Sequence, residues 1–150
     1  MRIDTEGIVL KNRPFGEADL IVTYLTKREG IVDTFAKSPR KIKSRFGSSL
    51  EPLTKARITF IGREQSMPRL IRSDIIKSHH LIREDLRAFL RVSLLIEIIL
   101  NMLPKKYGSE ELFNLFSTLL EDIESSLDKD YRDSIWLSSI ISLLSFLGYA

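Results

Sequence analysis

The spacing of apolar residues changes partway along the chain. Up to Ser78, β-branched and aromatic residues recur at alternate positions in short runs, which is the period of a strand with one buried face. Five such runs are separated by segments that contain Gly, Pro or Ser, and they cover residues 6–11, 20–25, 30–35, 54–61 and 68–77. Five short strands suit a small closed barrel, because closure leaves no strand edge exposed.

After Ser78 the apolar period becomes that of a helix. The most regular run follows Ser109, which is suited to an N-cap, and has Glu110 and Glu111 in its first turn, where negative charge favours the helix dipole. Its apolar positions recur three and four residues apart and are Leu112, Leu115, Phe116, Leu119, Leu120, Ile123 and Leu127. This run predicts an amphipathic helix.

Two further helices are predicted in the same half of the chain. One covers about residues 80–103 and stops at Pro104, and the other begins near residue 130 and ends with Gly148, a residue suited to a C-cap. The predicted fold class is therefore a β-barrel domain over residues 1–78 followed by an all-α domain of three helices over residues 79–150. No Pro- or Gly-rich linker separates them, so two modules packed together are expected.

Two segments of the predicted helices are unusually apolar, over residues 94–103 and 135–147. A helix that is apolar all round requires cover on all sides. Either these helices pack against each other and the barrel, or surface remains for a partner or for self-association. Both segments are shorter than the roughly 20 residues that span a bilayer, so no membrane contact is expected.

Charge is divided unevenly between the two predicted domains. Residues 1–78 hold 16 Lys and Arg and 9 Asp and Glu, whereas residues 79–150 hold 7 and 11. A basic module attracts polyanions, so nucleic acid is the expected partner of the barrel. The chain has no Cys, which excludes disulfides, thiolate metal sites and Cys nucleophiles, and its first residues lack the apolar core of an export signal. A cytoplasmic location is expected.

The most distinctive segment is the basic run over residues 37–45, with five basic and no acidic residues in nine positions. Pro39 opposes regular pairing, so the run is predicted to project from the barrel and contact phosphates. Phe46 follows the run and is predicted to be exposed. Phe15, Phe35 and Phe60 could also stack on bases, but aromatics at alternate strand positions usually belong to the core, and that is the favoured interpretation for them. The candidate nucleic-acid contacts are Lys37, Arg40, Lys41, Lys43, Arg45, Phe46, Lys11, Arg13 and Arg57. The alternative is a solvated loop that only aids solubility.

Residues that carry catalysis are not evident. The adjacent His79 and His80 point in different directions, so they do not form a facing ligand pair. Glu17 and Asp19 share one strand face, but no third ligand is near them in sequence. No Gly-rich phosphate loop, nucleophile elbow or zinc-protease motif is present. We therefore expect no catalytic residue, no metal and no cofactor, and a metal-dependent nuclease is a remote alternative.

An ordered series of short motifs resembles the bacterial recombination mediator family RecO. The series covers essentially the whole chain and includes residues 5–10, 16–19, 36–45, 50–53, 83–86, 112–113 and 147–149. RecO proteins generally continue well beyond the Leu-Gly-Tyr position, often through a four-cysteine zinc-binding region, so this chain looks like a shortened form. The resemblance implies that the barrel is an OB-fold and that the basic run contacts DNA.

The resemblance also implies a function. It points to non-enzymatic binding of single- and double-stranded DNA, annealing of complementary strands, and help in loading RecA onto DNA coated by single-stranded-DNA-binding protein in the nucleoid. RecR and the single-stranded-DNA-binding protein are the implied partners. The competing hypothesis is a protein-interaction adaptor, in which the helical half docks RecR or the tail of the single-stranded-DNA-binding protein and the loop charges are secondary.

Overall fold

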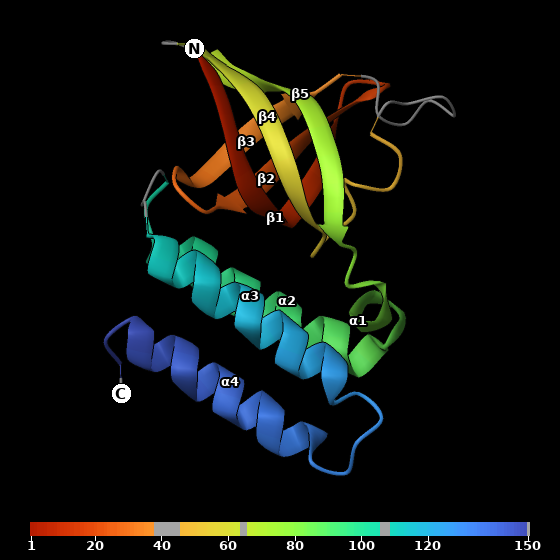
Figure 1. The fold of residues 1–150 in the computed structure, drawn as a ribbon, viewed down its shortest axis with the longest axis vertical. Coiled ribbons are helices and arrows are strands. Elements are labelled where there is room, and N and C mark those ends of the chain that lie inside the picture. The colour runs from red at the N-terminus through yellow and green to blue at the C-terminus, as the bar shows by residue number, and fades with distance from the viewer. Residues whose placement is uncertain (38–45, 64–65, 106–108, 150) are drawn as a thin grey trace. The chain divides into compact units, whose positions relative to one another are not determined.

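The computed structural model describes residues 1–37, 46–63, 66–105 and 109–149 and divides the chain into two compact units. The barrel unit holds Met1–Ser78 with Lys105–Ser109, and the helical unit holds His79–Pro104 with Glu110–Ala150. The barrel unit contains β1 (Arg2–Phe15), β2 (Asp19–Thr26), β3 (Gly30–Ala36), β4 (Lys55–Arg63) and β5 (Ser66–Lys77) (Figure 1). The helical unit contains α1 (His80–Glu84), α2 (Leu86–Met102), α3 (Glu110–Ser125) and α4 (Arg132–Phe146).

The five strands form a closed barrel in the order β1-β2-β3-β5-β4, which confirms the predicted fold class. β1 is long enough to pair with β4 through its first half and with β2 through its second half. The register shifts between Val9 and Lys11, where the two halves of β1 meet, and such a bulge bends a strand around a small barrel. The closing contact is weaker, because β3 and β5 are parallel and pair only at Phe35 and Arg69 among the described residues.

The barrel core includes Phe46, which corrects the prediction that this side chain is exposed. Phe46 is 3% exposed and packs in one cluster with Leu50 and the inward side chains of the strands. Residues 46–54 are anchored on β1, since the Asn12 Nδ2 donates to the Leu50 carbonyl at 2.8 Å. The apolar Phe46 and Leu50 drive this segment inward, directly after a run of cations.

The helical unit has four helices because the first predicted helix is divided at Asp85. The backbone of Asp85 is extended, with φ −104° and ψ 107°, and its side chain accepts a hydrogen bond from the Ala88 N–H at 3.1 Å. Asp85 therefore ends α1 and caps the start of α2, a role that Asp fills well. α3 follows its predicted course, and Gly148 has a φ of +93° directly after the C-cap of α4.

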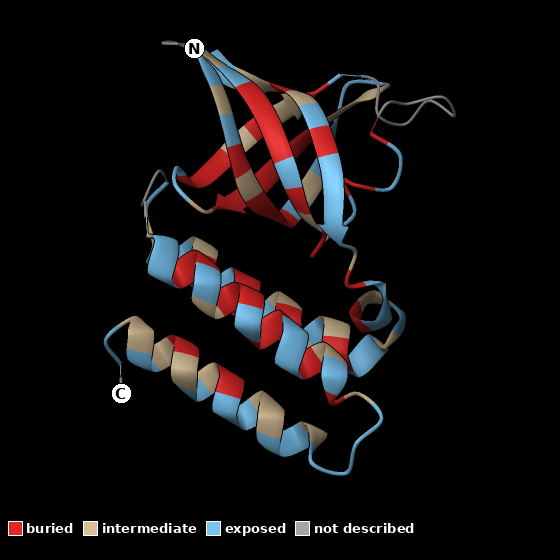
Figure 2. Ribbon diagram, in the orientation of Figure 1, coloured by how far each residue is buried: buried red, intermediate tan, exposed pale blue. Residues whose placement is uncertain are grey.

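Apolar side chains remain exposed on α2 and α4. Leu86, Leu90 and Leu94 recur four residues apart on α2 and are 74%, 60% and 45% exposed. On α4 only Ser139 and Leu143 are buried, which leaves much of that helix tan or pale blue in Figure 2. Part of the apolar surface of α2 and α4 is therefore exposed, which keeps open the alternative of a partner or of self-association. Within the described helices, none combines the length and apolar character needed to cross a membrane.

Candidate nucleic-acid interface

A row of residues paired in register crosses four strands of the barrel, and its members are exposed or partly exposed except for the buried Ile21. Arg13 on β1 is opposite Ile21 on β2, which is opposite Phe35 on β3, and Phe35 in turn pairs with Arg69 on β5. Neighbouring strands are about 4.8 Å apart, so this row places one cation on each side of an aromatic ring. We call the surface built on it the basic–aromatic face, and it consists of Lys11, Arg13, Phe15, Phe35, Lys37 and Arg69.

The two aromatic rings of this face contact each other. Phe15 and Phe35 meet edge to face, with ring centroids 5.9 Å apart and planes at 85°. Phe15 is 55% exposed although it is apolar, and Phe35 is partly exposed. An edge-to-face pair holds both rings in place, which leaves a firm apolar surface facing outward.

The cations of the face are not committed to carboxylates of the described residues. No ion pair within 4.0 Å joins Lys11 or Arg13 to a described carboxylate. The Nε of Arg69 is buried and makes no hydrogen bond to a described residue. Lys37 is exposed and directly follows β3, at the next outward position after Phe35. The exposed Lys11, Arg13 and Lys37 are therefore available to a polyanion, whereas Arg69 is only partly exposed.

Asp33 is a carboxylate beside this surface, in a second row with Thr23 and Lys11. Thr23 Oγ1 donates to Asp33 Oδ1 at 2.5 Å, and the Lys105 ammonium is bonded to the other carboxylate oxygen. Burial opposes ionisation of this carboxyl, but the two hydrogen bonds and the nearby charges of Lys105 and Lys11 hold the pKa of Asp33 below its usual value. Asp33 is thus an anion that Lys105 neutralises. Lys105 lacks any sequence signal for this role, because it is remote from Asp33 along the chain.

The other predicted contacts are placed differently. Arg57 is exposed, but it lies on β4 between Glu6 and Asp74 in the strand register, away from the row described above. Arg40, Lys41, Lys43 and Arg45 lie outside the described residues. The buried Phe46 does not present its ring to a ligand. The structure therefore groups Lys11, Arg13 and Lys37 and separates Arg57 from them.

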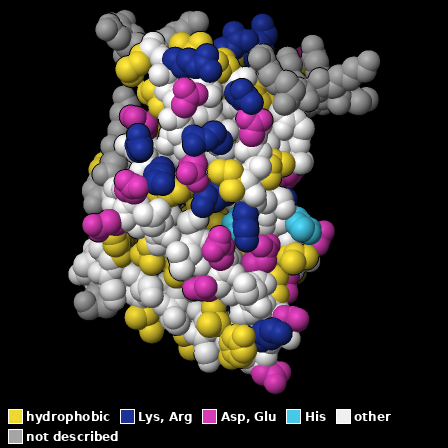
Figure 3. Space-filling view, viewed as in Figure 1, with side chains coloured by type: hydrophobic (Ala, Val, Ile, Leu, Met, Phe, Trp, Pro, Cys, Tyr) yellow, Lys and Arg dark blue, Asp and Glu magenta, His cyan; other side chains and the backbone are white. Residues whose placement is uncertain are grey.

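Charges on another part of the barrel surface are paired with each other, both within a strand and between strands. Asp4 bonds Thr59 and lies 3.8 Å from Arg2, and Arg72 donates to Asp74 at 2.7 Å. Glu6 likewise lies 3.8 Å from the ammonium groups of Lys27 and Lys55. We call this surface the charge-paired face; it consists of Arg2, Asp4, Glu6, Lys27, Lys55, Arg57, Arg72 and Asp74, mainly on β4, the C-terminal part of β5 and the first half of β1. Figure 3 shows the interleaved basic and acidic side chains where β4 and β5 face the viewer.

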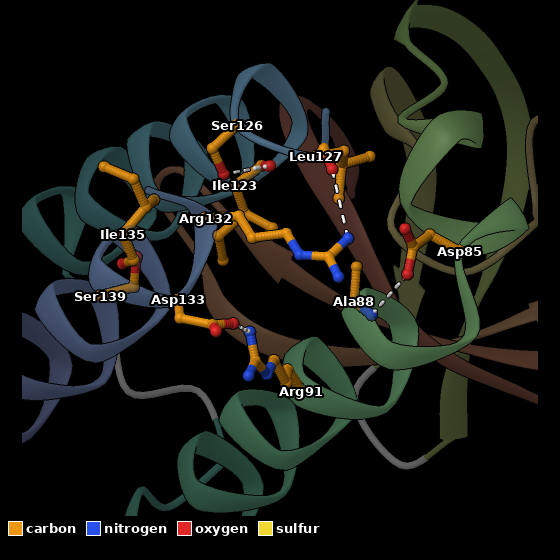
Figure 4. A network of polar contacts seen from close by, with 10 residues as sticks. All are labelled: Asp85, Ala88, Arg91, Ile123, Ser126, Leu127, Arg132, Asp133, Ile135 and Ser139. Carbon is orange, nitrogen blue, oxygen red and sulfur yellow. Dashed lines mark hydrogen bonds and ion pairs between the residues drawn. The ribbon is translucent and has the colours of Figure 1, made fainter. Parts of the chain in front are cut away.

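The helical unit has its own cluster of arginines, drawn in Figure 4. Arg91 on α2 donates to Asp133 at 2.9 Å and holds the pKa of that exposed carboxyl below its usual value, mainly through this hydrogen bond. The guanidinium of Arg91 also lies 5.5 Å from the centre of the Trp136 ring. The pocket beside these groups holds only about 20 Å³, roughly one water molecule. The cluster therefore joins α2 to α4 and offers little room for a ligand.

Side chains that bind metals are not gathered in the described residues. His79 is buried, and its Nδ1 lies 3.2 Å from Glu124 Oε1, whereas His80 is exposed. Among the described residues no three His, Asp or Glu side chains converge as metal ligands would. The buried His79–Glu124 contact links the start of α1 to α3 and has a structural role.

The fold and its surface define a class: an OB-like barrel with a basic–aromatic face, followed by a small helical unit. A family model described as Recombination protein O N terminal matches residues 1–79, and one described as Recombination protein O C terminal matches residues 83–150. The chain belongs to the RecO family, as the sequence motifs predicted.

Curated relatives agree with this family assignment. The chain is 50% identical over 149 residues to the DNA repair protein RecO of Thermodesulfovibrio yellowstonii, covering 99% of this chain and 58% of the relative. It is 33% identical over 149 residues to the DNA repair protein RecO of a Thermoanaerobacter species, covering 98% and 58%. For the Myxococcus xanthus protein of the same name the identity is 32% over 147 residues, covering 98% and 59%. The chain thus spans somewhat more than half the length of these relatives.

Proposed function

We propose that this chain acts in DNA repair by binding single-stranded DNA on the basic–aromatic face. The observation that carries the proposal is the row from Arg13 through Phe35 to Arg69, in which cations flank an outward aromatic ring. Barrel proteins bind single strands through this combination, because cations track the phosphates while rings stack on the bases. The names of the relatives, each a DNA repair protein, support the same role.

The proposed activity is annealing of complementary strands without any bond being made or broken. Two strands repel each other, and a cationic surface lowers this repulsion while leaving base edges free to pair. Lys37 leads directly into Arg40, Lys41, Lys43 and Arg45, whose charges would extend the phosphate-binding surface. Contacts to phosphates and stacking on the faces of bases do not distinguish one base from another, so sequence specificity is not expected.

The finer part of the proposal concerns partners in the cell. By analogy with its family, we infer that the protein helps to load RecA onto strands covered by single-stranded-DNA-binding protein, with RecR as a partner, in the cytoplasmic nucleoid. Double-stranded DNA is a second ligand under the same proposal, since its phosphates offer the same charge.

The test is fluorescence anisotropy of a labelled oligothymidylate across a salt series. Each phosphate contact with a single strand contributes about 0.7 to the slope of log affinity against log salt. We expect Lys11→Ala with Arg13→Ala to reduce this slope by about 1.4, the value for two lost contacts. The matched control is Arg2→Ala with Arg72→Ala, which removes the same charge from the charge-paired face. Equal slopes for the two double variants would overturn the proposed site.

A second candidate function is supported by the exposed leucines of α2. Leu86, Leu90 and Leu94 form an apolar stripe that is suited to a protein surface, such as RecR, the tail of the single-stranded-DNA-binding protein, or a second copy of the chain. Leu90→Glu with Leu94→Glu would abolish such docking and leave oligothymidylate binding unchanged. If these changes also abolished function in repair while the Lys11 and Arg13 variants did not, the adaptor hypothesis would replace the first.

A further inference from the structure

An open groove of about 940 Å³ lies on the barrel unit, lined by the first halves of β3 and β5 and the adjoining end of β4. Among the described residues, β3 and β5 pair only at Phe35 and Arg69. The described residues that precede this pair on the two strands are therefore not joined by backbone hydrogen bonds, and the groove lies between them. Its apolar lining consists of Met1, Ile3, Ile31, Val32, Phe60, Met67 and Pro68. Met67 is 37% exposed, so the lining is accessible from outside.

The rim of the groove carries Arg28, Glu29, Asp33 and Lys105, two charges of each sign. A groove with balanced charge and an apolar lining does not suit a phosphate chain, but it suits the flat, uncharged faces of nucleobases. Asp33 lies at this rim and also belongs to the row that contains Lys11. The groove therefore begins where the basic–aromatic face ends, so one strand of nucleic acid can reach both.

We propose that this groove accepts unstacked bases of a single strand whose backbone crosses the basic–aromatic face, with Lys105 as a phosphate contact at the rim. The inference rests on the proposed function and adds a strand preference to it. Lys105 is bonded to Asp33, whose side chain is 14% exposed, but the Lys105 side chain is itself 71% exposed. Its ammonium group can therefore approach a phosphate at the rim while it stays beside the carboxylate.

The groove makes the site selective for single strands. A base in a duplex is paired and stacked, and it enters a pocket only after unpairing, which costs a few kcal/mol. A base in a single strand avoids most of this cost. Contacts in the groove consequently strengthen binding of single strands and leave the affinity for duplexes, which rests on phosphates alone, nearly unchanged.

The experiment compares a labelled oligothymidylate with a blunt duplex of the same length, for the full chain and two groove variants. Met67→Asp places a negative charge in the groove, and we expect about a tenfold loss of single-strand affinity, within the range for one stacked base, with duplex affinity changed by less than about twofold. Ile76→Asp is the matched control, because Ile76 is an exposed apolar residue of the same strand outside the groove lining.

Lys105→Ala is the second variant, and its exposed side chain makes misfolding no concern. We expect it to weaken oligothymidylate binding and to lower the salt slope by about 0.7, whereas Lys129→Ala on the helical unit leaves both unchanged. If the wild-type chain binds oligothymidylate and neither groove variant alters that binding, this inference is overturned and the proposed function stands. That result would favour a polypeptide strand as the occupant of the groove. Failure of the unmodified chain to bind oligothymidylate would overturn both.

Discussion

The two faces of the barrel hold similar side chains but differ in how their charges are arranged. On the charge-paired face, acidic and basic residues alternate across the strands, as in Glu6, Arg57 and Asp74, and opposite charges placed this way attract each other. On the basic–aromatic face, Arg13 and Arg69 flank apolar residues instead. The number of cations on a surface is therefore a poor guide to its ligand; their freedom from carboxylate partners is a better one.

The largest expected effect is on strand annealing. Lys11→Glu with Arg13→Glu reverses two charges on the basic–aromatic face, and we expect the annealing rate of complementary oligonucleotides to fall by at least about 100-fold, since charged contacts contribute about 1.5–3 kcal/mol each. Arg2→Glu with Arg72→Glu makes the same change in net charge on the other face. A stopped-flow assay with fluorescent strands measures both, and equal losses would remove the distinction between the faces.

Substitutions of two phenylalanines are expected to have different effects, one on DNA binding and the other on the stability of the fold. Phe15→Ala is expected to weaken oligothymidylate binding by about 1–3 kcal/mol, the range for one stacked base, with little change in thermal unfolding. Phe46→Ala opens a cavity in the core, so its free energy of unfolding should fall by about 3–5 kcal/mol. Anisotropy and thermal melting give the two quantities. A Phe15 variant with normal binding would show that the exposed ring is not a base contact.

A smaller effect, of opposite sign, is expected at Asp33. Because its pKa is held below the usual value, Asp33 is ionised at neutral pH and repels phosphates. Asp33→Asn removes this charge and releases Lys105, so oligothymidylate affinity should rise about fivefold, the equivalent of about 1 kcal/mol. Glu51→Gln removes a charge from an exposed position elsewhere on the barrel unit and should change affinity far less.

The lowered pKa of Asp33 also predicts how the stability of the fold changes with pH. Asp33 binds its proton less readily in the folded chain than in the unfolded one, so its contribution to stability is present above the ordinary carboxyl pKa and is lost as the pH falls through the lowered value. The free energy of unfolding of the parent chain should therefore decrease a little more in acid than that of the Asp33→Asn variant. Chemical denaturation at a series of pH values measures both free energies. Parallel profiles would show that Lys105 and Thr23 do not favour the ionised form.

The smallest effect is expected for Arg57. Sequence composition alone placed Arg57 among the DNA contacts, but it lies between two carboxylate residues in the strand register. Arg57→Ala should change oligothymidylate affinity by less than about twofold, since exposed charges beside opposite partners contribute little. Anisotropy titrations of the Arg57→Ala and Arg13→Ala variants measure the difference. If Arg57→Ala lost as much oligothymidylate affinity as Arg13→Ala, the binding site would extend onto the charge-paired face.

Patterns within single elements were predictable from the sequence, and relations between elements were not. The strand and helix periods predicted a five-stranded barrel followed by helices, and Gly148 marked the end of α4. The break at Asp85 was missed because the apolar period continues across it, while a local cap overrides that period. Phe46 was misplaced because its neighbours in sequence are charged, whereas its burial depends on Asn12 holding residues 46–54 over the core.

The candidate site shows the same limit. Lys11, Arg13 and Lys37 were chosen for their charge, but only strand register reveals that Arg13 shares a row with Phe35 and Arg69. The bond between Lys105 and Asp33 joins residues far apart in the chain, which no local pattern indicates.

The most direct test of the central claim uses tryptophan fluorescence as a local reporter on each face. In a Trp136→Phe background, which removes the one natural Trp, Phe15→Trp places a reporter on the basic–aromatic face, and Ile76→Trp places one on the exposed end of β5. Stacking on bases quenches indole fluorescence, so oligothymidylate should quench the Phe15→Trp protein strongly and leave the Ile76→Trp protein nearly unchanged. Equal quenching of both, or quenching of the Ile76→Trp protein alone, would contradict the assignment of DNA binding to the basic–aromatic face.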